Sequence, residues 1–355
     1  MILVGVMAAT LWGIGAVMGA PGRARWVMIG FLFMAVLGAH FLLPDGHPLR
    51  EATGGEAALW LLIGGFVALV WLYRRGLGWL QQRAEKSEKV VEVAGPSGTF
   101  TEAELARTAR HIVLREIGGP GQKALKQARV LVVGAGGLGS PALQYLAAAG
   151  VGTIGVIDDD TVENTNLQRQ VIHTEAMIGA PKVRSAAAAM VAQNSAVTVR
   201  PYARRLTADI AADLFAEYDL ILDGSDNFET RYLVNATAVA LGKPLIAAAL
   251  TQWEGQISLY DPAHGTPCYA CIFPIAPDRA LVPSCAEAGV LAALPGVIGT
   301  LMAVEAIKAI TGAGEGLRGR LLLYDALYAE TRIIGMQRRA DCPVCGGHEA
   351  APAGI

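Results

Sequence analysis

The chain has 355 residues, of which 53% are hydrophobic and 17% are charged, and its formal net charge is −2. A typical globular protein has about 25% charged residues, so this composition argues against a wholly soluble protein, and it excludes intrinsic disorder, which requires low hydrophobicity and high charge. The near-neutral charge excludes a global basic field that would recruit nucleic acid, and five cysteines are too few for a disulfide scaffold.

Three uncharged apolar runs lie close to the N-terminus, at residues 1–20, 26–43 and 57–73, apart from one histidine, His40, in the second run. As helices rising about 1.5 Å per residue, they would each span roughly 25–30 Å, the thickness of a bilayer core. We therefore predict a membrane anchor at residues 1–80 that contains three transmembrane helices. A cleaved signal peptide is the alternative for the first run, but this run lacks a positively charged beginning and two further apolar runs follow it.

The charges between these runs predict the orientation of the anchor. Arg23 and Arg25 separate the first two runs, the second loop is mostly acidic, and five basic residues follow the third run, at positions 74, 75, 83, 86 and 89. Positive charge on the cytoplasmic side places the N-terminus outside and everything after the third run in the cytoplasm. We thus expect a multi-pass protein of the inner, cytoplasmic membrane whose cysteines lie in a reducing compartment, where metal or thiol chemistry is favoured over disulfides.

Residues 81–98 are charged and end in Gly-Pro-Ser-Gly, which is typical of a linker. A globular domain is predicted over residues 99–348. Thr101 and Glu104 fit a capping box that starts a helix at about 101–115. Strands are then expected at 128–133, 152–158, 197–203, 219–223, 244–249 and 255–260, with helices at 140–150 and 182–193. This alternation predicts an α/β fold with a Rossmann-like, mostly parallel sheet flanked by helices.

A glycine motif, Gly134, Gly136 and Gly139, directly follows the first of these strands and opens a helix. Glycines permit a tight turn and a close approach of the backbone, and a helix N-terminus favours phosphate. Asp158 ends the next strand, 24 residues beyond Gly134, where a ribose-binding acid is expected. The motif predicts a nucleotide site, and by itself it leaves NAD, FAD and ATP open.

The residues that follow favour a triphosphate. Asp158 and Asp160 are followed by two cations, Arg169 and Lys182, within 25 positions, and Asp226 ends a later strand. Hydride transfer needs an apolar slot for nicotinamide, whereas two cations and an acid at strand ends suit a triphosphate with Mg²⁺. The alternatives are a solvated helix face for the two cations and a turn cap for Asp226.

With these residues in view, the chain resembles the molybdopterin-synthase adenylyltransferase family (MoeB/ThiF/HesA), the prokaryotic relatives of ubiquitin-activating enzymes. The matching segments run in family order from about Arg107 to Cys345: GAGGLGSPALQYLAAAGVGTIGVIDDDTVENTNLQRQ, GAPKV, LDGSDN, EGQ, PCYAC, CAEAGV, GVIGTLMAVEAIK, YDA and CPVC. The resemblance implies a fold of the ubiquitin-activating-enzyme type. It also implies ATP-dependent adenylation of the C-terminal glycine of a small ubiquitin-like sulfur carrier, with release of pyrophosphate.

The resemblance also assigns site residues. It implies nucleotide contacts from Gly134, Gly136, Gly137, Gly139, Asp158, Asp160, Thr165, Asn166, Gln168, Arg169, Lys182, Asp226 and Asn227. Among these, Arg169 and Lys182 would contact the triphosphate in the transition state, and Asp226 would bind Mg²⁺. Arg110 would reach across a homodimer into the partner's ATP site. A carboxylate with a pKa of about 3.3–3.7 is already ionised at pH 7, so this chemistry needs no general base.

The cysteines form two CxxC pairs, Cys268 with Cys271 and Cys342 with Cys345. Two such pairs suit tetrahedral Zn²⁺, and the resemblance implies the same arrangement, with a redox pair as the alternative. Zinc would clip the C-terminal segment onto the rest of the domain. The fifth cysteine, Cys285, is either a small buried hydrophobe or, as the resemblance implies for some members, a nucleophile that bonds covalently to the carrier.

The membrane anchor departs from the usual family pattern. The sequence leaves open which carrier and pathway are served, and a thiamine-pathway or amino-acid-pathway carrier is an alternative to the molybdopterin-synthase small subunit. Dehydration of tRNA threonylcarbamoyladenosine is a further alternative, against which the two CxxC pairs count. From another class, a membrane-tethered NAD-binding regulator could use the same glycine-rich turn. Ten residues follow Cys345, so the sulfur is expected to come from another protein.

Overall fold

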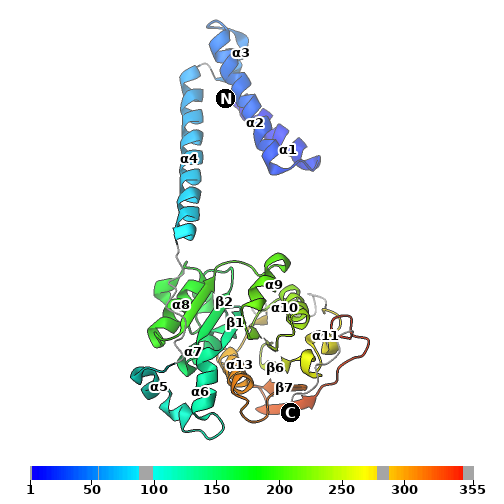
Figure 1. Cartoon of the computed structure of the whole chain (residues 1–355). Helices are drawn as coiled ribbons and strands as arrows, with labels where there is room; N and C mark the ends of the chain where they lie inside the picture. Colours follow the sequence, from blue (N-terminus) through cyan, green and yellow to red (C-terminus); the bar gives the residue numbers. More distant parts are fainter. Residues whose placement is uncertain (1, 55, 88–98, 278–287, 347–355) are drawn as a thin grey trace. The chain divides into compact units, whose positions relative to one another are not determined.

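A computed structural model describes residues 2–54, 56–87, 99–277 and 288–346 (Figure 1). The chain divides into two compact units, Met1–Val91 and Glu92–Ile355. Each unit has its own internal packing.

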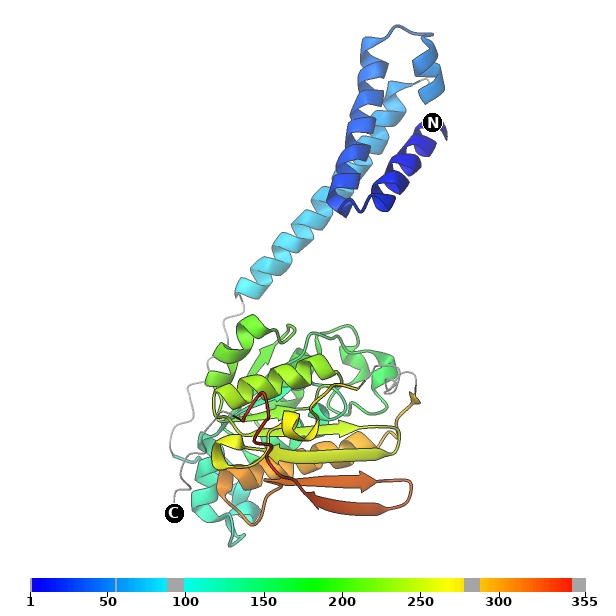
Figure 2. The same cartoon turned by 90° about the vertical axis from the view of Figure 1, so that its right-hand side faces the viewer.

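The first unit is entirely helical (Figure 2). Its described helices are α1 (Ile2–Val17), α2 (Gly22–Leu42), α3 (Pro48–Thr53) and α4 (Ala57–Ser87). Helix α2 packs against both α1 and α4, where Val4, Val36 and Trp60 form a small buried cluster. Most other large apolar side chains of the unit are exposed, so its surface is apolar wherever helices do not cover each other.

Helices therefore cover all three apolar runs that the sequence analysis singled out. Gly22–Leu42 and Ala57–Gly76 are long and apolar enough to cross a membrane, and α1 is a shorter apolar helix of 16 residues. A third helix of sufficient length and hydropathy, Leu294–Thr311, lies in the second unit and is far more buried. Its Ile298 and Met302 belong to the core of that unit, so its apolar character is explained by packing.

The second unit is built on an eight-stranded sheet in the order β3-β2-β1-β4-β5-β6-β7-β8. The strands are β1 (Arg129–Val133), β2 (Thr153–Ile157), β3 (Thr198–Tyr202), β4 (Leu220–Asp223), β5 (Leu245–Leu250), β6 (Glu254–Tyr260), β7 (Arg320–Asp325) and β8 (Glu330–Gly335). Strands β3, β2, β1, β4 and β5 are mutually parallel, whereas β5–β6, β6–β7 and β7–β8 pair antiparallel.

The sheet is therefore mixed: most of its strand pairs are parallel, as predicted, and strands β6, β7 and β8 add antiparallel pairs at one side. Only three residues separate β5 from β6, and four separate β7 from β8, where Ala329 turns the chain at φ 56°. Connections this short can only join antiparallel neighbours, because a parallel pair needs a crossover of a dozen or more residues. Strands β7 and β8 lie outside the expected strands, so the sequence analysis missed them.

Helices cover both faces of the sheet. They are α5 (Glu102–Ile112), α6 (Gly118–Gln127), α7 (Gly139–Ala149), α8 (Lys182–Gln193), α9 (Ala208–Ala216), α10 (Phe228–Ala240), α11 (Tyr269–Ile272) and α13 (Leu294–Thr311), with short 3₁₀ turns η1 (Asn164–Asn166), η2 (Glu175–Met177) and η3 (Pro262–His264). The capping box predicted at Thr101 and Glu104 starts α5.

Two hydrophobic cores result, one on each face of the sheet. Val130 and Val132 of β1 pack with α7, α8 and α13, whereas the alternate residues Leu131 and Val133 pack with α9 and α10. The period of two along a strand explains this division. Helix α13 approaches α7 closely because Gly299 has no Cβ, which would clash with the carbonyl group of Leu138, the residue before α7.

Candidate functional site

The site lies where the order of the parallel strands reverses. From β1 the chain proceeds outward to β2 and β3, and then returns to β4 on the other side of β1. Loops at the carboxyl ends of β1 and β4 therefore diverge and leave a crevice, the usual ligand site of such sheets. The two loops touch at their bases, since the Gly224 N–H donates to the Val133 carbonyl at 2.9 Å.

The loop after β1 depends on its glycines. Gly134 has φ +96°, a left-handed conformation that favours glycine. A Cβ at Gly139 would lie 2.9 Å from the carbonyl carbon of Gly134 and closer still to its oxygen, so the first residue of α7 must be glycine for this turn to close. Gly137 lies against Pro295 in the first turn of α13. The loop thus brings the N-terminus of α7, where backbone N–H groups favour anions, to the crevice.

Asp158 follows β2 and holds this loop. One of its carboxylate oxygens accepts from the Ala135 N–H at 2.7 Å, and the other accepts from the Asp160 N–H at 2.9 Å. Burial raises the pKa of Asp158, while these two N–H groups and the nearby charge of Lys182 oppose that shift. The predicted ribose ligand is therefore also a structural clamp on the glycine loop.

The two predicted cations lie on different elements. Lys182 is the first residue of α8, and its ammonium is paired with Asp160 at 2.8 Å while its side chain is only 6% exposed. Arg169 donates from its guanidinium to the Asn166 side-chain oxygen at 3.0 Å and to the Thr165 carbonyl at 3.3 Å. Thr165 and Asn166 thus fix the orientation of the Arg169 guanidinium through these two hydrogen bonds.

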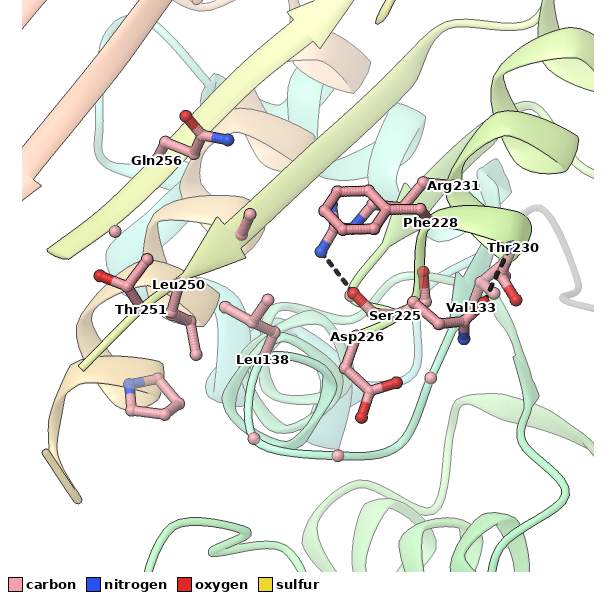
Figure 3. Close-up of a pocket in the computed structure, with 18 of the residues that line it drawn as sticks. Val133, Leu138, Ser225, Asp226, Phe228, Thr230, Arg231, Leu250, Thr251 and Gln256 are labelled. Atoms are coloured by element: carbon pink, nitrogen blue, oxygen red, sulfur yellow. Dashed lines mark hydrogen bonds between the residues drawn. The ribbon is translucent and has the colours of Figure 1, made fainter. Parts of the chain in front are cut away.

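The loop after β4 supplies Asp226 and Asn227. Asp226 is exposed and its carboxylate points into the open space beside the glycine loop (Figure 3). Asn227 is the N-cap of α10, and its side-chain oxygen accepts from the Thr230 N–H at 2.9 Å. Arg231, one turn into α10, is buried and donates to the Ser225 carbonyl (Figure 3), which fixes the loop that carries Asp226.

A cavity of about 1470 Å³ joins these groups. Of the predicted nucleotide residues, those that line it are Gly134, Gly136, Gly137, Asp158, Asp160, Arg169, Lys182, Asp226 and Asn227. Gly139, Thr165, Asn166 and Gln168 are not among its lining residues. Arg110 is exposed on α5 and does not line the cavity either, and Cys285 lies outside the described residues.

The cavity also extends onto the antiparallel half of the sheet. Gln256 of β6, Leu323 and Tyr324 of β7, and Arg332 of β8 line this part. Leu250 at the end of β5 and Phe228 at the start of α10 also line the cavity, and Figure 3 draws both together with Gln256. None of these residues was singled out from the sequence as a site residue. Leu323, Tyr324 and Arg332 lie on β7 and β8, which the sequence analysis did not predict. Gln256 lies on the strand predicted at 255–260, and its place in the EGQ segment is the signal that could have suggested it.

Two further residues of the segment before α8 were missed. Gln170 lines the cavity, is 5% exposed, and has a side-chain oxygen without a hydrogen-bond partner among the described residues. His173 is buried beneath the glycine loop. Gln170 is the last residue of the NLQRQ motif and His173 follows it by three residues, and this position is the signal that could have suggested them.

The four paired cysteines come together as predicted. Cys268, Cys271, Cys342 and Cys345 are all buried, and their Sγ atoms lie within 4.8 Å of one another. Measured distances are 3.9 Å for Cys268–Cys271, 3.6 Å for Cys268–Cys342 and 3.4 Å for Cys271–Cys345. Four thiolates about 2.3 Å from a tetrahedral Zn²⁺ would be about 3.8 Å apart, so the cluster fits this ion without rearrangement.

The fold and the site together define a class of protein: a Rossmann-like α/β domain whose cavity extends from the glycine loop after β1 onto the antiparallel part of the sheet. Residues 108–344 match the ThiF family. This chain belongs to the ThiF family.

Known relatives agree with this assignment. The chain is 51% identical over 251 residues to the sulfur carrier protein adenylyltransferase of Thermus thermophilus, covering 70% of this chain and 93% of that protein. It is 50% identical over 252 residues to the bovine adenylyltransferase and sulfurtransferase MOCS3, and 49% identical over 251 residues to the probable adenylyltransferase/sulfurtransferase MoeZ of Mycobacterium tuberculosis. These matches cover 71% and 70% of this chain, but only 55% and 64% of those two proteins.

Solved structures share the fold. The Escherichia coli protein MccB in complex with ATP is 26% identical and superposes with a TM-score of 0.60, covering 71% of this chain and 76% of that one. MccB in complex with AMPCPP and MccA gives 25% identity and a TM-score of 0.61, covering 71% and 77%. MccB, which shares this fold, is therefore known in complex with ATP and with AMPCPP and MccA together.

Proposed function

We propose that the chain uses ATP to adenylate the C-terminal glycine carboxylate of a small ubiquitin-like sulfur carrier. A carboxylate oxygen of the tail attacks the α-phosphorus of ATP. The bond between the α-phosphorus and the oxygen that bridges it to the β-phosphate breaks, and pyrophosphate leaves with that oxygen. The names of the relatives support this reaction: one is a sulfur carrier protein adenylyltransferase, and MOCS3 and MoeZ are named as adenylyltransferases and sulfurtransferases.

The observation that carries the proposal is the continuity of the cavity. One end is formed by the N-terminus of α7, Arg169 and Lys182, where a polyphosphate would find N–H groups and cations. The other end lies over β6 and β7, where an extended peptide tail could lie along the strands.

The chemistry requires positioning rather than proton transfer. The tail carboxylate is already anionic at pH 7, so the difficulty is to bring it to a polyanion. Arg169 and Lys182 would neutralise the phosphate charge, and Mg²⁺ held by Asp226 would neutralise more. Arg110 lies outside the cavity of its own chain, so we propose that it acts in the site of a second copy in a homodimer. The role of Cys285 as a covalent nucleophile stays a prediction.

We further propose that zinc occupies the cysteine cluster in a structural role. Burial raises the pKa of Cys268, so without a metal this thiol is neutral at pH 7. A bound zinc ion would stabilise the thiolates and tie Cys342 and Cys345, which follow β8, to the segment at α11.

We propose that residues 1–80 anchor the protein in the cytoplasmic membrane, with residues 81–98 as a linker and the catalytic domain at 99–348 in the cytoplasm. Exposed apolar helices support the anchor. Arginine–aromatic pairs, Arg25 over Trp12 and Arg75 over Trp71, are typical of a membrane–water interface. After extraction of membranes with alkaline carbonate, the full chain should stay in the pellet, and its release into the supernatant would contradict the anchor.

ATP–pyrophosphate exchange tests the reaction. The full chain in detergent should catalyse exchange only with a carrier that ends in Gly-Gly, and a panel of such carriers from molybdopterin and thiamine pathways would identify the partner. Arg169→Ala and Asp226→Ala should abolish exchange while leaving the fold intact. Arg200→Ala is the matched control, because Arg200 pairs with Glu217 away from the cavity and should retain exchange.

Two results would contradict the proposal. Undiminished exchange in Arg169→Ala or Asp226→Ala would refute the assignment of the pocket. Calorimetric binding of NAD in preference to ATP, with no exchange for any carrier, would favour the NAD-binding regulator instead.

A further inference from the structure

The peptide groups around Ala135, in the middle of the glycine loop, are held from two sides. The Ala135 N–H donates to Asp158 at 2.7 Å, as described above, and the Ala135 carbonyl lies 2.9 Å from Nε2 of His173. His173 comes from the segment between η1 and η2, 38 residues later in the chain. A loop of small residues is thus fixed by two long-range contacts.

The chemistry of its partners determines the tautomer of His173. A carbonyl oxygen can only accept, so Nε2 must carry the hydrogen that it donates to Ala135. Burial lowers the pKa of His173, and the nearby charge of Lys182 lowers it further, whereas Asp158 raises it. The ring is therefore neutral at pH 7, and its Nδ1 accepts a hydrogen bond from the Ser185 hydroxyl at 3.0 Å.

This bond determines where the next backbone N–H points. The described residues contain no cis peptide bond, and in a planar trans peptide the C=O and the following N–H point in opposite directions. Because the Ala135 carbonyl points to His173, the N–H of Gly136 points away from it. Gly136 and Gly137 line the cavity, and within the described residues their N–H groups find no acceptor.

The same ring also reaches the helix that carries a predicted cation. Ser185 is buried on α8, three residues after Lys182, which begins that helix. His173 thus connects the glycine loop, through Ala135, to the turn of α8 that carries Lys182. The His173 imidazole therefore fixes the position of the glycine-loop N–H groups relative to the Lys182 ammonium, and both would contact the phosphates.

We propose that His173 is a positioning residue for the nucleotide: it aims the Gly136 N–H at a phosphate oxygen and fixes the distance between the glycine loop and Lys182. The inference rests on the proposed function in that the bound anion is the polyphosphate of ATP. His173 does not line the cavity, so it acts through Ala135 and Ser185 and not by direct contact.

Three variants in the full chain separate positioning from packing. His173→Gln can place an amide N–H close to the position of Nε2, His173→Asn can reach only the position of Nδ1, and His173→Phe keeps the ring without either group. Loss of a single aimed hydrogen bond should weaken ATP binding roughly tenfold. We expect the dissociation constant and the KM for ATP to rise by about this factor in the Phe and Asn variants, and by less than about threefold in the Gln variant. The KM for the carrier should stay unchanged in all three.

The readout does not depend on the carrier, because ATP binding is measured by calorimetry on the protein alone, beside its melting temperature. Equal ATP affinity in wild type and the Phe variant would overturn the inference, as would equal losses in the Gln and Asn variants. Should the Phe variant fail to fold, the comparison of Gln with Asn decides alone. If wild type binds ATP but exchanges with no carrier, the proposed function fails while the role of His173 is still tested.

Discussion

Replacing Gly139 with alanine tests how closely the start of α7 packs against the glycine loop. The added Cβ would lie 2.9 Å from the carbonyl carbon of Gly134, whereas non-bonded carbons are most stable at about 3.5–4.0 Å. The backbone of Gly134 is itself held by a 2.9 Å hydrogen bond to Ile157 of β2, so α7 would have to move by at least about 0.6 Å, the difference between these distances. We expect a loss of about 1–3 kcal/mol in the free energy of unfolding.

The same shift should reduce activity more than stability, since a displacement of about 1 Å of positioned groups can cost roughly a hundredfold in rate. Urea unfolding in detergent and ATP–pyrophosphate exchange measure the two effects. Gly335→Ala is the matched control, because Gly335 lies exposed at the end of β8 with nothing within 4 Å of its Cβ position, and alanine there should stabilise by about 0.4–1 kcal/mol. If both variants unfold at the same urea concentration and retain exchange, the steric reasoning is wrong.

Three further outcomes are expected. Lys182→Met should lower kcat/KM for ATP at least a hundredfold, since it removes a buried cation from a polyanion site. Asp160→Asn should lower kcat/KM less than tenfold, because it frees that cation from its partner. Steady-state exchange kinetics measure both values, and a larger loss in Asp160→Asn than in Lys182→Met would contradict this reasoning. Cys345→Ser should reduce bound zinc from one equivalent to near zero by elemental analysis and lower the melting temperature, and a variant that keeps its zinc would exclude the four-thiolate site. The pKa of His173 is lowered in the folded state, so the unfolded state binds more protons below about pH 6.5 and stability should fall as the pH drops from there. In a plot of melting temperature against pH, His173→Gln should reduce the slope below about pH 6.5. An unchanged slope would count against a buried neutral ring.

Much of the fold followed from local patterns. The capping box at Thr101 begins α5, and Pro181 directly precedes α8. The β-branched runs before Gly134 and Asp158 are β1 and β2. These features depend on neighbouring residues only, through steric limits on φ and ψ and through hydrophobic periodicity, so they can be predicted without knowledge of long-range contacts.

The antiparallel half of the sheet was harder to predict. Strand β8 is exposed along its length, so its sequence lacks the alternation of buried and exposed residues that marks a strand. Its identity comes from pairing with β7, which in turn pairs with β6. The part of the cavity that β7 and β8 line therefore could not be inferred from the order of residues along the chain.

The candidate site divides in the same way. Local spacing indicated Gly134, Asp158 and the cations, because a phosphate-binding turn needs consecutive residues of defined type. The spacing of the two CxxC pairs also indicated that the four cysteines meet, as they do. Contacts between residues far apart in sequence decided the rest, as in the placement of His173 under Ala135. Such contacts depend on how the helices and strands pack, and the hydrophobic effect that drives packing is not directional, so only the assembled tertiary structure specifies which distant side chains meet.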